Sequence, residues 1–89
     1  MYEKTIGKKR SRFQIIADIL KKLRKPSKKT HIMQKCNLSF PQLKHYLSYL
    51  SFTALIRRKE KKGMVKYHIT KKGWDFLKNY NRITKLLQP

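Results

Sequence analysis

The chain has 89 residues, with 24 Lys and Arg against 4 Asp and Glu, so its formal net charge is +20 and its pI is near 10.5. Such an excess of positive charge favours nucleic acid as the partner, because neutralising phosphates releases counterions and stabilises binding to a basic surface of almost any shape. Apolar residues make up 39% of the chain and recur periodically, which indicates one small folded domain and argues against a disordered tail.

The composition also argues against a membrane protein and against a secreted one. The sequence has no apolar run long enough to span a bilayer, and its start, MYEKTIGKKR, lacks the apolar middle of a signal peptide. Its one cysteine, Cys36, cannot form an internal disulfide. We therefore expect a cytoplasmic, nucleoid-associated protein that makes no contact with membranes.

Residues 1–10 form a basic segment without periodicity and predict an N-terminal arm. Basic arms can enter a minor groove, which makes Lys8, Lys9 and Arg10 candidate DNA contacts, although a frayed and merely solubilising terminus is an equal alternative. From Ser11 onward, apolar residues fall at helical spacing until Pro26 ends the run. The residues of this first helical stripe are Phe13, Ile16, Ala17, Leu20 and Leu23.

A helix-turn-helix is predicted next. Ser27 is a natural N-cap for a short helix with Ile32, Met33 and Cys36 on one face, and residues 37–39, NLS, are typical of a turn. Ser39 and Gln42 stand at capping-box spacing before a helix from about Phe40 to Ser51. Its apolar seam is Leu43, Leu47 and Leu50.

Residues 55–70, LIRRKEKKGMVKYHIT, predict a basic β-hairpin that turns around Lys61, Lys62 and Gly63. Val65, Tyr67 and Ile69 alternate with Lys66 and His68, so one face of the second strand should lie inward, while Ile56 should face the same core from the first strand. A bare hairpin is marginally stable, which is why this one should pack on the helices and extend its tip sideways as a wing.

Thr70 is expected to cap a last helix. In that helix Trp74 and Leu77 should close over the core, and a separate heptad seam should mediate dimerisation. The seam residues are Phe76, Tyr80, Ile83 and Leu87. The predicted fold is mainly α with a small β-hairpin, a winged helix-turn-helix of order α-α-α-β-β-α. Its parts are an arm at 1–10, the winged helix-turn-helix domain at 11–72 and a C-terminal dimerisation helix at 73–89.

Candidate DNA-binding residues follow from this arrangement. On the third helix, Gln42 and His45 should reach base edges, while its other polar residues should hold phosphates or sugars; a solvated face is the alternative. The recognition-helix candidates are Ser39, Gln42, Lys44, His45, Ser48 and Tyr49. The wing candidates are Arg58, Lys61 and Lys62, and those at the start of the second helix are Lys28, Lys29 and His31.

Catalytic and metal chemistry are not expected. The carboxylates Glu3, Asp18, Glu60 and Asp75 cannot be placed in a shared pocket with a nucleophile or a base, which predicts a non-enzyme without cofactor. The three histidines and Cys36 show no standard ligand spacing, and Cys36 lies on an apolar helix face, so we expect a buried structural thiol and no metal. No small-molecule pocket is evident.

The stretch KKTHIMQKCNLSFPQLKHYLSYL, with ALIRR and YHITKKGWDFL after it, resembles the archaeal winged-helix regulator family that includes the dimeric ten-kilodalton DNA-binding proteins of crenarchaea. The resemblance covers about residues 12–87. It implies a winged helix, double-stranded DNA as ligand, and a homodimer through the last helix as an antiparallel coiled coil. The last helix is shorter than the family's. Ala54 stands where the family usually has Gly, and a left-handed Ala would cost about 1 kcal/mol.

The function predicted from the sequence is double-stranded DNA binding by a transcriptional regulator or a nucleoid-associated protein. The recognition helix would enter the major groove and the basic wing would lie on flanking phosphates. Two alternatives stay open. One is an RNA-binding or ribosome-associated winged helix, whose binding would depend on charge because the major groove of A-form RNA is too narrow for a helix. The other is a protein-interaction module for an acidic partner.

Overall fold

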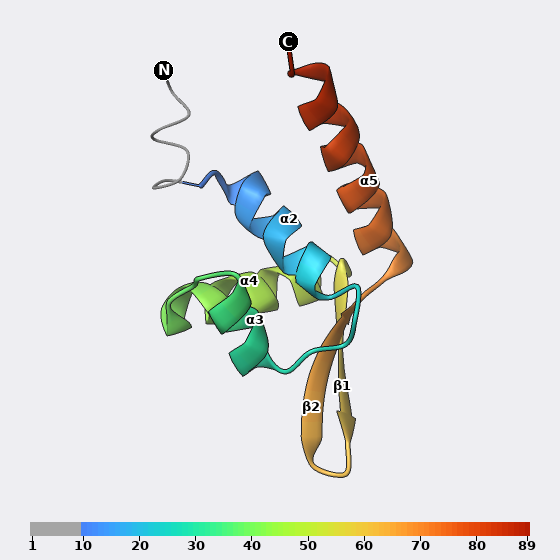
Figure 1. The fold of residues 1–89 in the computed structure, drawn as a ribbon. Coiled ribbons are helices and arrows are strands. Elements are labelled where there is room, and N and C mark those ends of the chain that lie inside the picture. Colours follow the sequence, from blue (N-terminus) through green and yellow to red (C-terminus); the bar gives the residue numbers. More distant parts are fainter. Residues whose placement is uncertain (1–9) are drawn as a thin grey trace.

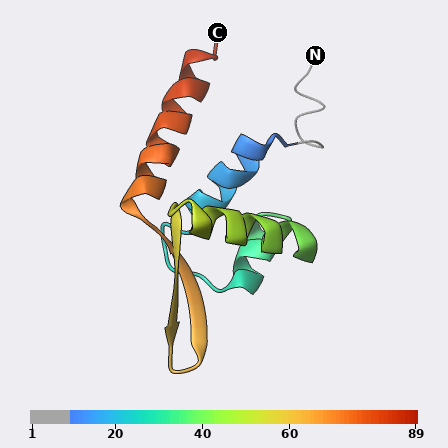
Figure 2. The ribbon, with the colours of Figure 1, turned by 180° about the vertical axis from the view of Figure 1, so that it is seen from behind.

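A computed structural model of the chain describes residues 10–89, and their elements follow the predicted order of three helices, a hairpin and a last helix (Figure 1). The elements are α2 (Arg12–Lys22), α3 (Lys29–Lys35), α4 (Phe40–Phe52), β1 (Ile56–Lys61), β2 (Met64–Ile69) and α5 (Lys71–Leu86). The hairpin and the free end of α5 point in opposite directions from the helices (Figures 1 and 2). No helix within residues 10–89 has the length and apolar composition needed to cross a membrane.

The core lies where α2, α3 and α4 meet the root of the hairpin and the first turns of α5. Its largest fully buried side chains are Ile19, Leu20, Leu23, Ile32, Leu43 and Leu50. The predicted inward residues Ile56 and Leu77 are each 2% exposed, and Val65, Tyr67 and Ile69 are half-buried. The alternation predicted for the second strand is therefore confirmed on its inner face.

The turn between α3 and α4 has the predicted geometry. Asn37 has a φ of 54°, in the left-handed region that Asn tolerates, and Leu38 turns into the core at 7% exposure. The Ser39 hydroxyl accepts a bond from the Gln42 amide, and the Gln42 side chain accepts one from the Ser39 amide. This capping box fixes where α4 begins and therefore which of its side chains face outward.

The prediction that Ser27 caps α3 is wrong. The N-cap residue is Lys28, whose side chain makes no capping bond. Ser27 is instead buried and pairs with β2, because its amide donates to the Tyr67 carbonyl at 2.9 Å and its carbonyl accepts from the Tyr67 amide at 2.8 Å. Two main-chain bonds to β2 compete successfully with one side-chain cap, and they attach the segment before α3 to the hairpin.

The hairpin turns at Lys62 and Gly63, whose φ values are 53° and 78°. Both central residues are left-handed, which matches the twist of two antiparallel strands. In the register, Arg58 lies opposite Tyr67 and Lys59 lies opposite Lys66. Since side chains alternate, these two pairs lie on opposite faces of the hairpin.

Helix α5 begins as predicted at the Thr70 cap, whose hydroxyl accepts a bond from the Gly73 amide. The prediction that Trp74 closes over the core is wrong, because this side chain is 47% exposed while Gly73 and Leu77 are buried. Helical spacing directs Leu77 and Gly73 inward, which leaves Trp74 at the edge of that face. The predicted boundary between residues 72 and 73 falls inside α5.

The predicted dimerisation seam divides into two halves. Phe76 and Tyr80 are half-buried, stack on each other and pack against the core, and the Phe76 ring lies 6.4 Å from that of Phe13 on α2. Ile83 and Leu87 are 57% and 78% exposed. Of the four predicted seam residues, Ile83 and Leu87 are thus the two that are free to meet a partner.

Ala54 adopts the left-handed conformation with a φ of 64°, as a Gly at this position would. The turn keeps the geometry that the family resemblance implies, and the chain accepts the local cost of a Cβ there.

Candidate nucleic-acid interface

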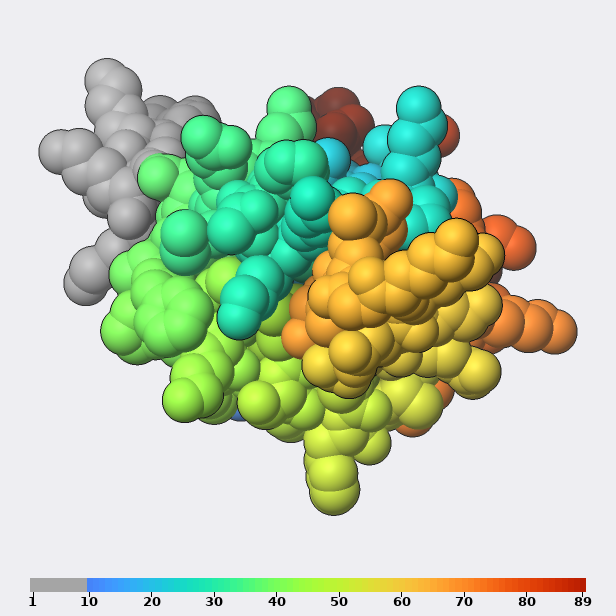
Figure 3. Space-filling view, turned by 90° about the horizontal axis from the view of Figure 1, so that it is seen from below, coloured from blue at the N-terminus to red at the C-terminus, as the bar shows by residue number. Residues whose placement is uncertain are grey.

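Three elements meet on one face of the molecule, which Figure 3 shows from below: the exposed side of α4, the start of α3 and the tip of the hairpin. A depression of about 440 Å³ lies between α4 and the hairpin. The polar and aromatic side chains that line it are Lys29, Phe40, Lys44, Ser48, Ser51, Arg58 and Tyr67. This groove brings cations from α3, α4 and β1 to one place.

A second depression of about 590 Å³ adjoins the first toward the wing tip and shares Lys29, Arg58 and Tyr67 with it. It adds Lys28 from the start of α3 and Lys62 from the turn. The two depressions therefore form one basic groove that runs from α4 to the tip of the hairpin.

The groove is short of negative charge. Among residues 10–89, the inner face of the hairpin carries a single carboxylate, that of Glu60. Its Oε1 lies 3.7 Å from the Arg58 guanidinium nitrogen Nη2. Both side chains are more than half exposed, so this ion pair contributes little and leaves Arg58 able to exchange it for a phosphate.

Two of the predicted recognition residues have local structural roles. Ser39 and Gln42 form the capping box of α4, in which the Gln42 Oε1 accepts from the Ser39 amide at 3.0 Å. Reading adenine through two bonds requires both ends of the Gln42 amide, so such a contact competes with the cap. His45 is exposed and packs edge-on against the Tyr46 ring, with centroids 5.2 Å apart, and Tyr49 is exposed outside the groove.

Two aromatic residues of the groove were not among the predicted contacts. Phe40, the first residue of α4, is 55% exposed, and the Lys29 Nζ lies 5.9 Å from its ring centroid. Tyr67 was predicted only as an inward residue of the hairpin. The helical spacing of Phe40, Lys44 and Ser51 is the signal in the sequence that could have placed Phe40 beside predicted contacts.

Several other predicted residues lie away from the groove. Lys61 lines the opposite face of the hairpin, and His31 is exposed but lines neither depression. The predicted DNA contacts Lys8 and Lys9 lie outside the residues that the structure describes.

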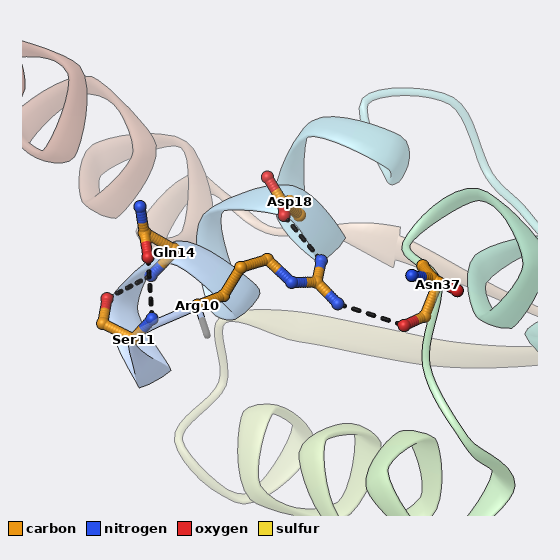
Figure 4. A network of polar contacts seen from close by, with 5 residues as sticks. All are labelled: Arg10, Ser11, Gln14, Asp18 and Asn37. Atoms are coloured by element: carbon orange, nitrogen blue, oxygen red, sulfur yellow. Dashed lines mark hydrogen bonds and ion pairs between the residues drawn. The ribbon is translucent and has the colours of Figure 1, made fainter. Parts of the chain in front are cut away.

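Arg10 belongs to a network between α2 and the turn that precedes α4 (Figure 4). Its guanidinium donates to the Asp18 carboxylate at 2.9 Å and to the Asn37 carbonyl at 3.1 Å, so it joins α2 to the turn that precedes α4. The same figure shows the Ser11 and Gln14 capping box that begins α2. Arg10 is thereby engaged within the fold.

The family model described as "Winged helix-turn-helix" matches residues 9–88. The chain belongs to the winged helix-turn-helix family. In this winged helix, α3 and α4 form the helix-turn-helix, α4 is its second helix, and the hairpin is the wing.

Solved structures share the fold of this winged helix. Sso10a-2, a DNA-binding protein from Sulfolobus solfataricus, is similar with a TM-score of 0.79 and 21% identity over 86% of this chain and 81% of that one. A mutant of S. aureus MepR bound to an oligodeoxyribonucleotide is similar with a TM-score of 0.72 and 11% identity, over 94% of this chain and 65% of that one. Streptococcus pneumoniae FabT in complex with DNA is similar with a TM-score of 0.65 and 18% identity, over 96% of this chain and 66% of that one. Comparison with curated proteins gives no match. The predicted resemblance to the crenarchaeal proteins is confirmed at the level of the fold.

Cys36 of this winged helix is buried at 3% exposure, which confirms the prediction of a buried thiol. Burial, and then the nearby Asp18 carboxylate, raise the pKa of the thiol to about 11. The thiol is therefore neutral at physiological pH. Within residues 10–89, no three His, Cys, Asp or Glu side chains gather as metal ligands.

Proposed function

We propose that this winged helix binds double-stranded DNA as a transcriptional regulator or a nucleoid-associated protein. The observation that carries the proposal is the convergence of cations from three separate elements on the groove beside α4. They are Lys28, Lys29, Lys44, Arg58 and Lys62. Two proteins of the same fold have been solved with DNA, MepR and FabT, which supports the same class of ligand here.

In the proposed complex, α4 enters a major groove, whose width of about 12 Å admits one helix. Lys44 and Ser48, on the side of α4 that faces the wing, would hold the phosphates at one edge of that groove. Arg58 and Lys62 would contact phosphates that flank it, because the wing extends beyond the helix (Figure 1). Lys28 and Lys29 would bind the same backbone from the start of α3.

Base reading is expected to be modest. Gln42 can present its amide nitrogen to a base without leaving the capping box, but a two-bond contact with adenine would break the box. His45 and Phe40 are also exposed near the start of α4, where they can meet base edges or a thymine methyl group. We therefore expect phosphate contacts to supply most of the affinity.

The test is fluorescence anisotropy with a labelled duplex of DNA. Arg58→Glu with Lys62→Glu should weaken binding to all duplexes alike by about tenfold or more, because phosphate contacts are lost and repulsion is added. The matched control is Lys78→Glu with Lys85→Glu, which makes the same charge change on exposed positions of α5. Equal losses in the two variants would overturn the proposed interface.

Competition between duplex DNA and duplex RNA of one sequence addresses the RNA-binding alternative. If the protein binds DNA as proposed, unlabelled DNA should be the better competitor, since α4 fits a B-form major groove and not an A-form one. Equal competition would favour binding by charge alone.

We also propose a homodimer through the second half of α5. Ile83, Leu86 and Leu87 are 57%, 78% and 78% exposed, an apolar surface on a helix that extends beyond the domain (Figure 2). Phe13, 61% exposed on α2, lies beside Phe76 and extends this surface toward the core. A second copy of α5, lying antiparallel, would cover it and keep the two basic bodies apart.

Sedimentation of Ile83→Asp against the parent tests the dimer. The variant should be monomeric, while Asn81→Asp, which adds the same charge at another exposed position of α5, should remain dimeric. Repulsion between the basic bodies opposes association, so the parent dimer should tighten as salt rises. Equal masses for Ile83→Asp and its parent at every salt concentration would refute the dimer.

A further inference from the structure

The outer face of the hairpin, the one turned away from α4, is a second dense array of cations. Its residues follow from the register, in which Arg57 pairs with His68, Lys59 with Lys66, and Lys61 with Met64. Side chains of directly opposed residues point to the same side of the sheet. The outer face therefore carries four cations, Arg57, Lys59, Lys61 and Lys66, together with His68 and Met64.

Within residues 10–89, no carboxylate forms an ion pair with this face. Among residues 10–89, Glu60 is the carboxylate of the hairpin, and it lies on the inner face beside Arg58. Lys59 stands directly opposite Lys66, an arrangement in which like charges destabilise a strand pair. A hairpin that keeps such a pair on its surface gains stability when an anion neutralises it.

The face is also hollowed. Pro26 stands beside the hairpin, and a depression of about 500 Å³ is lined by Pro26, Lys59, Lys61, Lys62, Met64, Lys66 and His68. A smaller one of about 260 Å³ continues it to the root, where Arg57, Lys59 and His68 are joined by Lys71 of α5. Within this surface the His68 Nε2 is buried and has no hydrogen-bond partner among residues 10–89.

We propose that the outer face of the wing, centred on Lys59 and Lys66, is a second phosphate-binding surface that holds a second DNA duplex. The proposal rests on the proposed function, since the first duplex occupies the groove on the inner side. Strands of this length extend about 20 Å, which corresponds to the axial rise of about six phosphates of one DNA strand. The four cations thus lie along strands whose length matches about six phosphates of a duplex backbone.

Two physical arguments favour a second duplex over the flanks of the first. The side chains of the two faces point in opposite directions, so one backbone cannot contact both except around the tip. A minor groove about 6 Å wide is also too narrow to admit a whole two-stranded ribbon with long side chains on both faces. Each wing would then lie between two duplexes.

The test measures how many short duplexes of DNA one full-length protomer binds at saturation, by sedimentation of mixtures with labelled DNA. The wild type should bind two duplexes per protomer, the second more weakly. Lys59→Gln with Lys66→Gln should bind one, with an affinity for that first duplex within about threefold of the wild type. Lys78→Gln with Lys85→Gln, which removes the same charge from α5, should still bind two.

The duplexes are too short to span both protomers of a dimer, so dimerisation through α5 does not change the number bound per protomer. The second surface would be refuted if the wild type saturated at one duplex, or if the variant of Lys59 and Lys66 still bound two. Either result would leave the proposed function intact. A tenfold loss of first-duplex affinity in that variant would assign the outer face to the first duplex and overturn the proposal. No binding at all by the wild type would refute the proposed function itself.

Discussion

Thr70 Oγ1 donates a hydrogen bond of 2.6 Å to the carbonyl oxygen of Ala54, the left-handed residue of the turn that follows α4. The same oxygen accepts a bond of 3.1 Å from the Gly73 amide in the first turn of α5. One hydroxyl therefore connects the end of α4 to the start of the last helix. Lys72 adds a second connection, since its Nζ lies 2.8 Å from the Thr53 carbonyl oxygen.

Replacing Thr70 should destabilise the fold through both bonds. We expect Thr70→Ala to lower the free energy of unfolding by about 1–2 kcal/mol, the usual cost of a lost cap and an unpaired carbonyl. Thr70→Ser retains the hydroxyl and should lose less than half of that. Urea denaturation followed by circular dichroism measures both, and equal losses would mean that the methyl group matters more than the hydroxyl.

Gly73 permits α5 to approach the chain that leads into the wing. A Cβ there would collide with the Leu55 carbonyl oxygen and would lie 2.6 Å from Ile69 Cγ1. Because a backbone oxygen cannot rotate away, Gly73→Ala should cost about 2–3 kcal/mol of stability. Asn79→Ala, at an exposed position of the same helix, is the control and should change stability little. An unchanged Gly73→Ala protein would mean that α5 can shift without loss.

Ala54→Gly should do the opposite and stabilise the protein. The left-handed φ of 64° is free of strain for Gly, so we expect a gain of about 0.5–1 kcal/mol despite the added freedom of the unfolded chain. Ala17→Gly, inside α2 where the residue is fully buried, is the contrasting variant and should lose stability. A loss in both variants would show that the Ala54 methyl group makes contacts worth more than the strain.

The stability of the protein should depend on His68 below neutral pH. Burial, and then the charges of Lys59 and Arg57, lower the pKa of His68 below its ordinary 6.5. Lys66 also carries positive charge on this face, and Pro26, which stands beside it, is uncharged.

As pH falls through 6.5, the unfolded chain therefore takes up a proton at this histidine before the folded one does. The His68 contribution is present above pH 6.5 and is lost as pH falls toward the folded pKa. Urea midpoints between pH 7.5 and 5 should show a decline that His68→Gln reduces. The same decline in both proteins would place its origin elsewhere.

DNA affinity should depend strongly on salt. If one protomer neutralises about six phosphates, the slope of log K against log salt should be near −5, because each contact releases roughly 0.9 of a counterion. Anisotropy titrations between low and moderate salt measure it, and Arg58→Gln with Lys62→Gln should make the slope shallower by about 2. A slope shallower than about −2 for the wild type would mean that most of the charge lies off the interface.

The fold was predictable from local signals that needed no knowledge of packing. The Ser39 and Gln42 capping box, the left-handed Asn37 and the Thr70 cap each depend on residues within a few positions. The predicted capping role of Ser27 is wrong because its partner, Tyr67, is 40 positions away in the sequence. A capping rule considers only neighbouring residues and therefore does not include such a bridge.

The candidate site was predictable as a set of elements but less so as individual side chains. The alternation of the strands decides which face each strand lysine occupies, and it places Lys61 on the outer face, while Lys62 at the turn borders the depressions on both faces. Gln42 looked like a base reader because it stands near the start of an exposed helix, yet the same position also serves the cap. The sequence around Gly73 gives no reason for a glycine there, because the reason is the carbonyl of Leu55, which is distant in the sequence.

The pairing of Ser27 with Tyr67 makes the root of the wing and the start of α3 one rigid piece. The spacing between the backbone positions of Lys29 and Arg58 is then set when the chain folds, so only the two side chains have to be ordered when a ligand arrives. Such a fixed spacing favours phosphate backbones that already lie at the matching distance. We therefore expect this protein to discriminate duplexes by groove width and stiffness more than by the bases they contain.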